Sequence, residues 1–190
     1  MSKKLLMLCG DFMEDYETMV PFVALQCLGH KVIAVCKGKK SGETVKTSVH
    51  DFEGQQTYSE KVGHNFWLNG NFNEVLNELD SFDGLVIPGG RAPEYIRLEE
   101  EVITITKHFL ENNKPIAVIC HGPLVLVAAG GLKGRECSAY PACGPDVTLS
   151  GGKYIKVESG QSHVEGNIVS APDWTCMVPW IQNYHKLLTK

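Results

Sequence analysis

The chain has 190 residues, of which 43% are hydrophobic and 21% charged, and its formal net charge is −4 at pH 7. These values are typical of a globular protein, and we expect a single domain over residues 1–190. The negative charge and the absence of a basic run disfavour nucleic acid and anionic membrane surfaces as partners. No apolar run suits a membrane span or a secretory signal, so we expect a cytoplasmic protein.

Cysteine and histidine spacing limits the chemistry further. The seven cysteines are odd in number and none forms a C-x-x-C pair. Several lie in apolar runs, where a free cysteine packs as a small hydrophobic residue, so we expect a reducing compartment without a disulfide framework. The histidines lack paired ligand spacing and no G-x-G-x-x-G occurs. We therefore predict neither a metal nor a cofactor.

The N-terminal part of the chain starts with a regular alternation of elements. We expect a strand, a helix and a second strand at 4–9, 17–28 and 31–36. Residues 38–72 break this rhythm, because they are polar, rich in Gly and Asn, and weakly periodic. We interpret this stretch as an excursion that contains a hairpin, with strands near 46–58 and 64–68, and not as a linker between domains.

The alternation resumes after the excursion. The expected elements are a strand at 82–90, a helix at 99–112, a strand at 115–120, a helix at 122–130, a strand at 167–171 and a closing helix at 175–188. Continuous apolar strands separated by helices are typical of a parallel sheet covered on both faces. The pattern predicts an α/β fold of the flavodoxin-like type, with a doubly wound, mostly parallel sheet.

Cys120 ends one of these apolar strands and is followed directly by His121, Gly122 and a helix. Open parallel sheets place ligands at this carboxyl edge. The helix N-terminus favours a thiolate and would lower the pKa of the thiol, while the glycine permits the tight turn of a nucleophile elbow. We predict a nucleophile here. The alternative is a buried core cysteine that happens to end a strand.

Two other stretches belong to the same predicted edge. Residues 11–17, after the first strand, are rich in acids. These acids either complement a helix N-terminus or bring one carboxyl group to the thiol. The second alternative requires that the first strand and the Cys120 strand be neighbours. The glycines of 88–94 either point backbone N–H groups at an oxyanion or form a plain turn. His50 and His64 flank the hairpin, and each either reaches the pocket or lies at the surface.

The motifs EDYE (14–17), PGGRAPE (88–94) and ICHGP (119–123) together resemble the PfpI/ThiJ superfamily over nearly the whole chain. Longer stretches, among them GDFMEDYETMVPF and VHDFEGQQTY, are most similar to the plant glyoxalase III branch. That branch usually carries two tandem copies, and this chain carries one.

The resemblance implies roles for individual residues. Cys120 matches the nucleophile, and Glu17 matches the carboxylic acid that contacts the sulfur. His121 supplies an imidazole, and its backbone N–H matches an oxyanion donor together with that of Gly90. Glu94 matches an acid that reaches a histidine across a subunit boundary, so we expect a homo-oligomer, at least a dimer.

The late stretch SAPDWTCMVPW departs from the signatures of other branches. We expect Asp173 and Trp174 to line the pocket, although the sequence assigns them no roles. Simple packing of the closing helix is the alternative for Trp174.

The resemblance implies a stress-related enzyme that acts on small reactive aldehydes without a cofactor. Methylglyoxal or glyoxal would form a hemithioacetal with Cys120 and leave as a hydroxy acid, which is a glyoxalase III type lyase reaction. One alternative is a PfpI-like cysteine peptidase, a hydrolase that uses Cys120, His121 and Glu94. The other is a redox-sensing or chaperone-like protein in which Cys120 is oxidised instead of turning over substrate.

Overall fold

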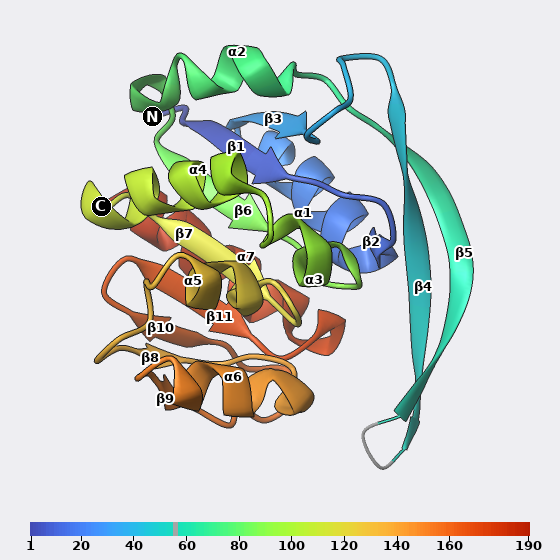
Figure 1. The fold of residues 1–190 in the computed structure, drawn as a ribbon, viewed down its shortest axis with the longest axis vertical. Coiled ribbons are helices and arrows are strands. Elements are labelled where there is room, and N and C mark those ends of the chain that lie inside the picture. The colour runs from blue at the N-terminus through green and yellow to red at the C-terminus, as the bar shows by residue number, and fades with distance from the viewer. Residues whose placement is uncertain (55–56) are drawn as a thin grey trace.

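The structure is a computed structural model that describes residues 1–54 and 57–190. Its centre is a six-stranded sheet with the order β10-β11-β7-β6-β1-β3 (Figure 1). Neighbouring strands run parallel, except that β10 is antiparallel to β11. The strands are β1 (Lys4–Leu8), β3 (Lys31–Val35), β6 (Gly84–Ile87), β7 (Ile116–Ile119), β10 (His163–Glu165) and β11 (Ile168–Ala171).

Helices cover both faces of this sheet, because β6, β7 and β11 are buried along their whole length and need apolar cover on each side. Helix α1 (Asp15–Cys27) packs against α7 (Met177–Leu188) on one face. The other face carries α4 (Glu100–Glu111) and α5 (Pro123–Ala128) (Figure 1). The predicted doubly wound, mostly parallel sheet is therefore confirmed.

Several short elements have no counterpart in the expected pattern. Helices and strands of two to six residues are too short for hydrophobic periodicity to reveal. These elements are β2 (Met13–Glu14), α2 (Phe72–Leu76), α3 (Ala92–Ile96), β8 (Glu136–Cys137), α6 (Gly144–Leu149) and β9 (Lys153–Tyr154). No helix among the described residues is long and apolar enough to cross a membrane.

The polar excursion is a long hairpin that runs alongside the sheet (Figure 1). Its strands are β4 (Thr44–Gly54) and β5 (Thr57–Trp67), so the expected hairpin is confirmed but its expected strand limits are wrong. Part of the first expected strand, residues 55–56, lies outside the described residues. The outer ends of both strands are exposed on two sides, which removes the alternation from which limits are inferred.

The strand order corrects one expectation about the site. β1 and β7 are not neighbours, because β6 pairs with both of them and lies between them. The carboxyl ends of these parallel strands still meet at one edge, so a residue that follows β1 reaches the Cys120 turn only across the end of β6.

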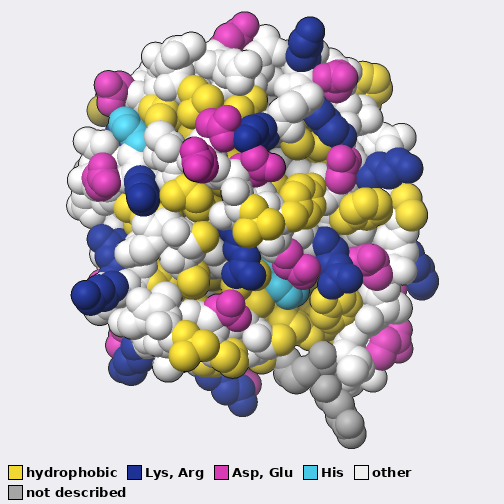
Figure 2. Space-filling model, in the orientation of Figure 1, with side chains coloured by type: hydrophobic (Ala, Val, Ile, Leu, Met, Phe, Trp, Pro, Cys, Tyr) yellow, Lys and Arg dark blue, Asp and Glu magenta, His cyan; other side chains and the backbone are white. Residues whose placement is uncertain are grey.

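Figure 2 shows acidic and basic side chains intermixed with hydrophobic ones over the described residues of one face. Charges of both signs alternate there over short distances, which is consistent with the small net charge of the chain.

Candidate active site

The turn after β7 holds Cys120 in a left-handed backbone conformation, with φ of 58°. A residue other than glycine adopts this conformation at an energetic cost, and such strain is concentrated at functional sites. The turn is fixed by the N–H of Gly122, which donates to the carbonyl of Ile119 at 2.7 Å, and by the N–H of Cys120, which donates to Ala171 at 3.0 Å. A Cβ on Gly122 would lie 2.9 Å from the Ile119 oxygen, so the predicted glycine requirement is physical. The geometry is that of a nucleophile elbow.

Glu17 reaches this turn from the first turn of α1, across the end of β6. Its side chain is fully buried, and its Oε2 accepts a 3.0 Å hydrogen bond from the backbone N–H of Gly89. A Cβ on Gly89 would collide with Glu17 Oε2 and with the Cβ of Cys120. Glycine at this position is therefore what lets the carboxyl group and the thiol lie side by side although their strands are not neighbours.

Desolvation in this pocket favours the protonated forms of Glu17 and Cys120. Burial raises the pKa of Glu17, and the nearby carboxyl groups of Glu14 and Asp173 raise it further. Burial is also the main cause that raises the pKa of Cys120, followed by Glu17, while a hydrogen bond from the backbone of Gly90 lowers it. The lowered thiol pKa expected from the helix N-terminus is wrong for this closed pocket, because α5 is short and the sulfur is desolvated. The raised pKa of Glu17 and its proximity to the sulfur agree with the role that the resemblance implied.

His121 lies between the thiol and an acid. Its Nδ1 is 3.4 Å from the Sγ of Cys120, and its Nε2 is 3.9 Å from Oε1 of Glu94. Burial lowers the pKa of His121 more than Glu94 raises it, so the ring is neutral near pH 7 and can accept the thiol proton. The resemblance put the acid–histidine contact across a subunit boundary. Here the two residues of one chain already meet, and self-association stays a prediction.

These groups surround a cavity of about 10 Å³, which is roughly the space of one water molecule. Its lining residues come from the sheet edge, the start of α1, the hairpin and two loops: Glu14, Glu17, His50, Phe52, Tyr58, Cys120, His121, Tyr140 and Trp174. The cavity therefore combines a reactive thiol with titratable groups and a largely aromatic wall.

The aromatic wall is a stack. Phe52 lies between Trp174, with ring centroids 5.5 Å apart, and Tyr140, with ring centroids 6.4 Å apart. The indole N–H of Trp174 donates to the backbone oxygen of His50 at 3.1 Å, which joins the loop after β11 to the hairpin. Trp174 thus lines the pocket, as expected. Asp173 is instead the N-cap of a 3-10 helix, where its carboxylate accepts the N–H of Thr175 at 2.9 Å.

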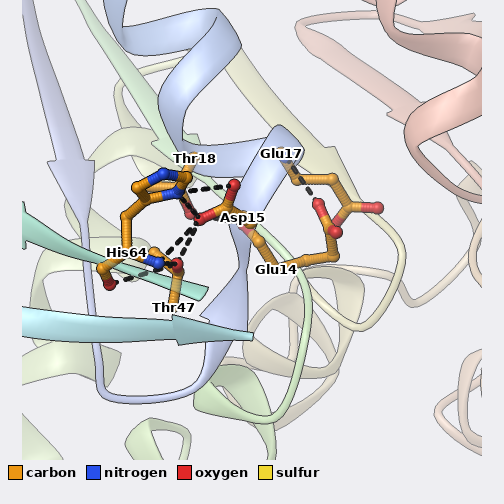
Figure 3. Close-up of polar contacts among 6 residues, drawn as sticks. All are labelled: Glu14, Asp15, Glu17, Thr18, Thr47 and His64. Carbon is orange, nitrogen blue, oxygen red and sulfur yellow. Dashed lines mark hydrogen bonds and ion pairs between the residues drawn. The ribbon is translucent and has the colours of Figure 1, made fainter. Parts of the chain in front are cut away.

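The first turn of α1 divides its acids between two tasks (Figure 3). Glu14 caps the helix by accepting the N–H of Glu17 at 2.8 Å, and burial raises its pKa to about 7. Asp15 points away from the pocket toward the hairpin, where it accepts from the hydroxyl of Thr47 and lies 3.1 Å from Nδ1 of His64. We expected these acids either to serve the helix end or to bring one carboxyl to the thiol. Glu14 serves the helix end, and Asp15 lies in the first turn of α1 and also binds the hairpin.

The structure also separates the two hairpin histidines. His50 is 6% exposed and lines the pocket, whereas the side chain of His64 is 71% exposed and holds Asp15. The sequence pattern did not single out Phe52, Tyr58 or Tyr140. His50 and Phe52 are two residues apart on a strand and so share a face, which is the signal that a correct placement of the hairpin would have provided.

The fold and the site define an α/β protein with a buried cysteine at a nucleophile elbow. The profile described as the DJ-1/PfpI family matches residues 3–187, so the chain belongs to the DJ-1/PfpI family.

Relatives and solved structures agree with this assignment. Protein DJ-1 homolog D of Arabidopsis thaliana is 52% identical over 174 residues, which is 91% of this chain and 44% of that protein. Deglycase PfpI of Pyrococcus furiosus is 36% identical over 185 residues and is covered over 99% of its length. The chain spans less than half the length of the Arabidopsis relatives that it matches. The crystal structure of Drosophila melanogaster DJ-1beta shares the fold, with a TM-score of 0.81 at 21% identity over 100% of this chain and 92% of that one.

Proposed function

We propose that the chain is an enzyme that converts methylglyoxal or glyoxal to a hydroxy acid through a hemithioacetal on Cys120. Relatives named deglycases support an enzyme, and the finer assignment rests on the pocket. The observation that carries it is the meeting of the thiol of Cys120, the buried carboxyl of Glu17 and the imidazole of His121, whose Nδ1 is 3.4 Å from the sulfur, at one cavity of about 10 Å³.

The small size of the cavity favours a small aldehyde over a peptide. An extended peptide needs an open groove for its backbone and flanking side chains, whereas the stacked rings of Phe52 and Trp174 form one wall of this small site. A two- or three-carbon dicarbonyl needs only a small outward shift of the aromatic wall. A peptidase is therefore the weaker reading of the same thiol and imidazole.

The first step is addition of sulfur to the aldehyde carbon. Nδ1 of His121, 3.4 Å from the thiol, takes its proton as the carbon–sulfur bond forms. The aldehyde oxygen gains the negative charge, and the backbone N–H of Gly90, which already points at the sulfur, stabilises it. We predict the same role for the backbone N–H of His121. Glu17 transfers its proton to this oxygen, which completes the hemithioacetal.

The second step moves hydrogen between the two carbons. The carboxylate form of Glu17 removes the proton from the former aldehyde carbon and returns it to the neighbouring carbon. Its Oε1 suits this transfer because it is buried and has no hydrogen-bond partner among the described residues. The second oxygen takes up a proton, the first oxygen returns its proton to Glu17, and a thioester of the hydroxy acid results. Water then cleaves the thioester and regenerates the thiol, so no oxidant or reductant is consumed.

Ionisation also separates this proposal from redox sensing. Peroxide attacks thiolates, and a sensor thiol is exposed and has a lowered pKa. Cys120 is 8% exposed and its pKa is raised. These two properties favour a thiol that ionises only when substrate and His121 are in place.

The test is consumption of methylglyoxal without added thiol cofactor, followed together with the appearance of lactate. Wild type should turn over, and Cys120→Ala should be inactive with an unchanged circular dichroism spectrum and melting temperature. Cys27→Ala is the matched control, because Cys27 is an exposed free thiol and its loss should leave the rate within about twofold. Turnover by Cys120→Ala, or none by wild type, would contradict the proposal.

A further inference from the structure

A second histidine, His50, lines the cavity together with Cys120 and His121. It comes from β4, whereas His121 comes from the elbow, so the two imidazoles enter the cavity from different elements. They are close enough for a charge on His50 to lower the pKa of His121. The proposed reaction as described so far gives His50 no task.

Each of the two histidines is backed by a glutamate. Nε2 of His50 lies 2.8 Å from Oε2 of Glu60, its direct partner across the hairpin, just as Nε2 of His121 faces Glu94 at 3.9 Å. Arg91 joins the two acids, with Nε 3.5 Å from Glu60 and a terminal nitrogen 3.5 Å from Glu94. The rim of the cavity therefore carries two histidine–glutamate pairs bridged by one guanidinium group.

His50 is fixed in place by its surroundings. Its backbone oxygen accepts the indole N–H of Trp174 at 3.1 Å, and its backbone N–H stabilises the charged form of the Glu14 carboxyl. Its ring makes a T-shaped contact with Tyr58 at a centroid distance of 5.0 Å. A residue held at its backbone, at Nε2 and by a neighbouring ring is pre-organised, which is what a group that acts on substrate requires.

The proposed reaction has a need that the other residues leave unmet. Removal of the proton from the former aldehyde carbon puts negative charge on the oxygen of the second carbon. Glu17 is occupied with the carbon-bound proton at that moment, and the backbone of Gly90 serves the first oxygen. A donor for the second oxygen must enter from another side of the cavity, and the hairpin is the element that faces the elbow.

We propose that His50, oriented by Glu60, is a second acid/base residue that protonates the oxygen on the second carbon of the dicarbonyl substrate. In the imidazolium form Nε2–H remains bound to the Glu60 carboxylate and Nδ1–H donates to the substrate oxygen. The N–H bond breaks, an O–H bond forms and the ring becomes neutral. His50 then regains a proton from water, while the thiol proton held by His121 leaves to water, so protons balance and no electrons are exchanged. The inference rests on the proposed function, because it assigns a step of that reaction.

The test uses the full chain, methylglyoxal as the probe and three variants. His50→Gln keeps a hydrogen-bond donor but cannot titrate, and it should lower kcat about 100-fold with KM within about threefold. Glu60→Gln should lower kcat about tenfold, because the ring stays but loses its orienting charge. Asp51→Asn is the matched control. Its side chain is next in β4, exposed and paired with Lys61 at 3.7 Å, and its loss should leave kcat unchanged.

Two further readouts separate chemistry from folding. In His50→Gln, methylglyoxal should still protect Cys120 from iodoacetamide, which shows that the hemithioacetal forms and that the pocket is intact. In His50→Ala, added imidazole should restore kcat at least tenfold, an effect that a purely structural role for the ring would not give.

The outcomes separate this inference from the proposed function. Wild-type turnover together with a kcat for His50→Gln within threefold of wild type would overturn the role of His50 and leave the function standing. Loss of protection by methylglyoxal in His50→Gln would also overturn it, because His50 would then serve binding. Absence of turnover in wild type would overturn both.

Discussion

The elbow and the hairpin both line the cavity, but different forces hold them. The elbow follows β7, whose residues are completely buried, and its backbone is tied to Ile119 and to Ala171 at the end of the neighbouring strand β11. The hairpin is exposed along much of its length and reaches the rest of the molecule through β2, the side chain of Asp15 and the indole of Trp174.

This difference teaches how the site divides its work. Groups that form and break bonds need positions fixed to within fractions of an ångström, and the core of a parallel sheet provides them. The element that admits substrate must move, and the exposed outer part of the hairpin, beyond its buried base residues Val45 and Phe66, can open at small cost. We therefore assign the bond changes at sulfur and carbon to the sheet edge, the proposed proton donation by His50 to the buried part of the hairpin, and control of substrate size and access to its exposed outer part.

The largest effect should come from the acid at the sheet edge. Glu17→Gln keeps the shape and the bond from Gly89 but cannot exchange a proton, so we expect kcat to fall by about 100-fold or more. Methylglyoxal should still protect Cys120 from iodoacetamide, since Nδ1 of His121 still accepts the thiol proton and the glutamine amide can still donate a hydrogen bond to the new oxygen. Glu14→Gln, which retains the helix cap, should cost less. Full turnover by Glu17→Gln would remove the carbon-to-carbon proton transfer from this residue.

A smaller effect should follow from the acid behind His121. Glu94→Gln leaves the imidazole in place but removes the charge that raises its pKa, and we expect kcat to fall about tenfold. His121 must be neutral to accept the thiol proton, so the acid limb of the kcat–pH profile should move to lower pH. Glu100→Gln, an exposed change on α4, is the control. An acid limb that stays in place would mean that the 3.9 Å contact does not act on the imidazole.

Glu94 also bears on assembly. We predict that the wild-type chain sediments as a homo-oligomer, although the contact of Glu94 with His121 already exists within one chain. A fully active wild-type monomer would contradict a site that is shared between subunits.

The smallest effect on chemistry should come from the base of the hairpin. Asp15→Asn removes the charge that Thr47 and His64 hold, so we expect the free energy of unfolding to fall by about 1–3 kcal/mol and turnover by only a few-fold. Burial alone would raise the pKa of Asp15, but those hydrogen bonds outweigh burial and lower the pKa below its ordinary value. The contribution of the Asp15 charge to the free energy of unfolding is therefore complete above the ordinary aspartate pKa. It is lost as the pH falls through the lowered pKa of the folded state.

Urea unfolding of wild type and Asp15→Asn measures this directly. The difference between them should be largest near pH 7 and should shrink in acid. A difference that is the same at pH 7 and pH 3 would show that the charge of Asp15 does not hold the hairpin.

Much of the elbow follows from the sequence because local rules govern it. A continuous apolar strand that ends in Cys120, His121 and Gly122 specifies a tight turn at the carboxyl edge whatever the rest of the chain does. The position of Glu17 beside the sulfur did not follow in the same way. It depends on the strand order and on the missing side chain of Gly89, which are properties of the assembled sheet.

The pocket residues of the hairpin and the ionisation of the thiol could not be predicted from the sequence in this way. His50 and Phe52 line the pocket through packing of β4 against distant segments, and a half-exposed ribbon leaves little periodicity to interpret. The raised pKa of Cys120 results mainly from desolvation of its sulfur. The sequence pattern of the helix that follows Cys120 contains no information about that desolvation.

The division of work between the two regions is tested most directly by the ratio of kcat/KM for methylglyoxal to that for phenylglyoxal, in wild type and in Phe52→Ala. Phe52 is 40% exposed, so its removal should leave the fold intact while it opens the aromatic wall. The account predicts a ratio that falls by about tenfold or more, with turnover of methylglyoxal within a few-fold of wild type. An unchanged ratio would contradict control of substrate size by the hairpin, and a collapse of methylglyoxal turnover with the fold intact would give Phe52 a part in the chemistry, where the account gives it only control of access.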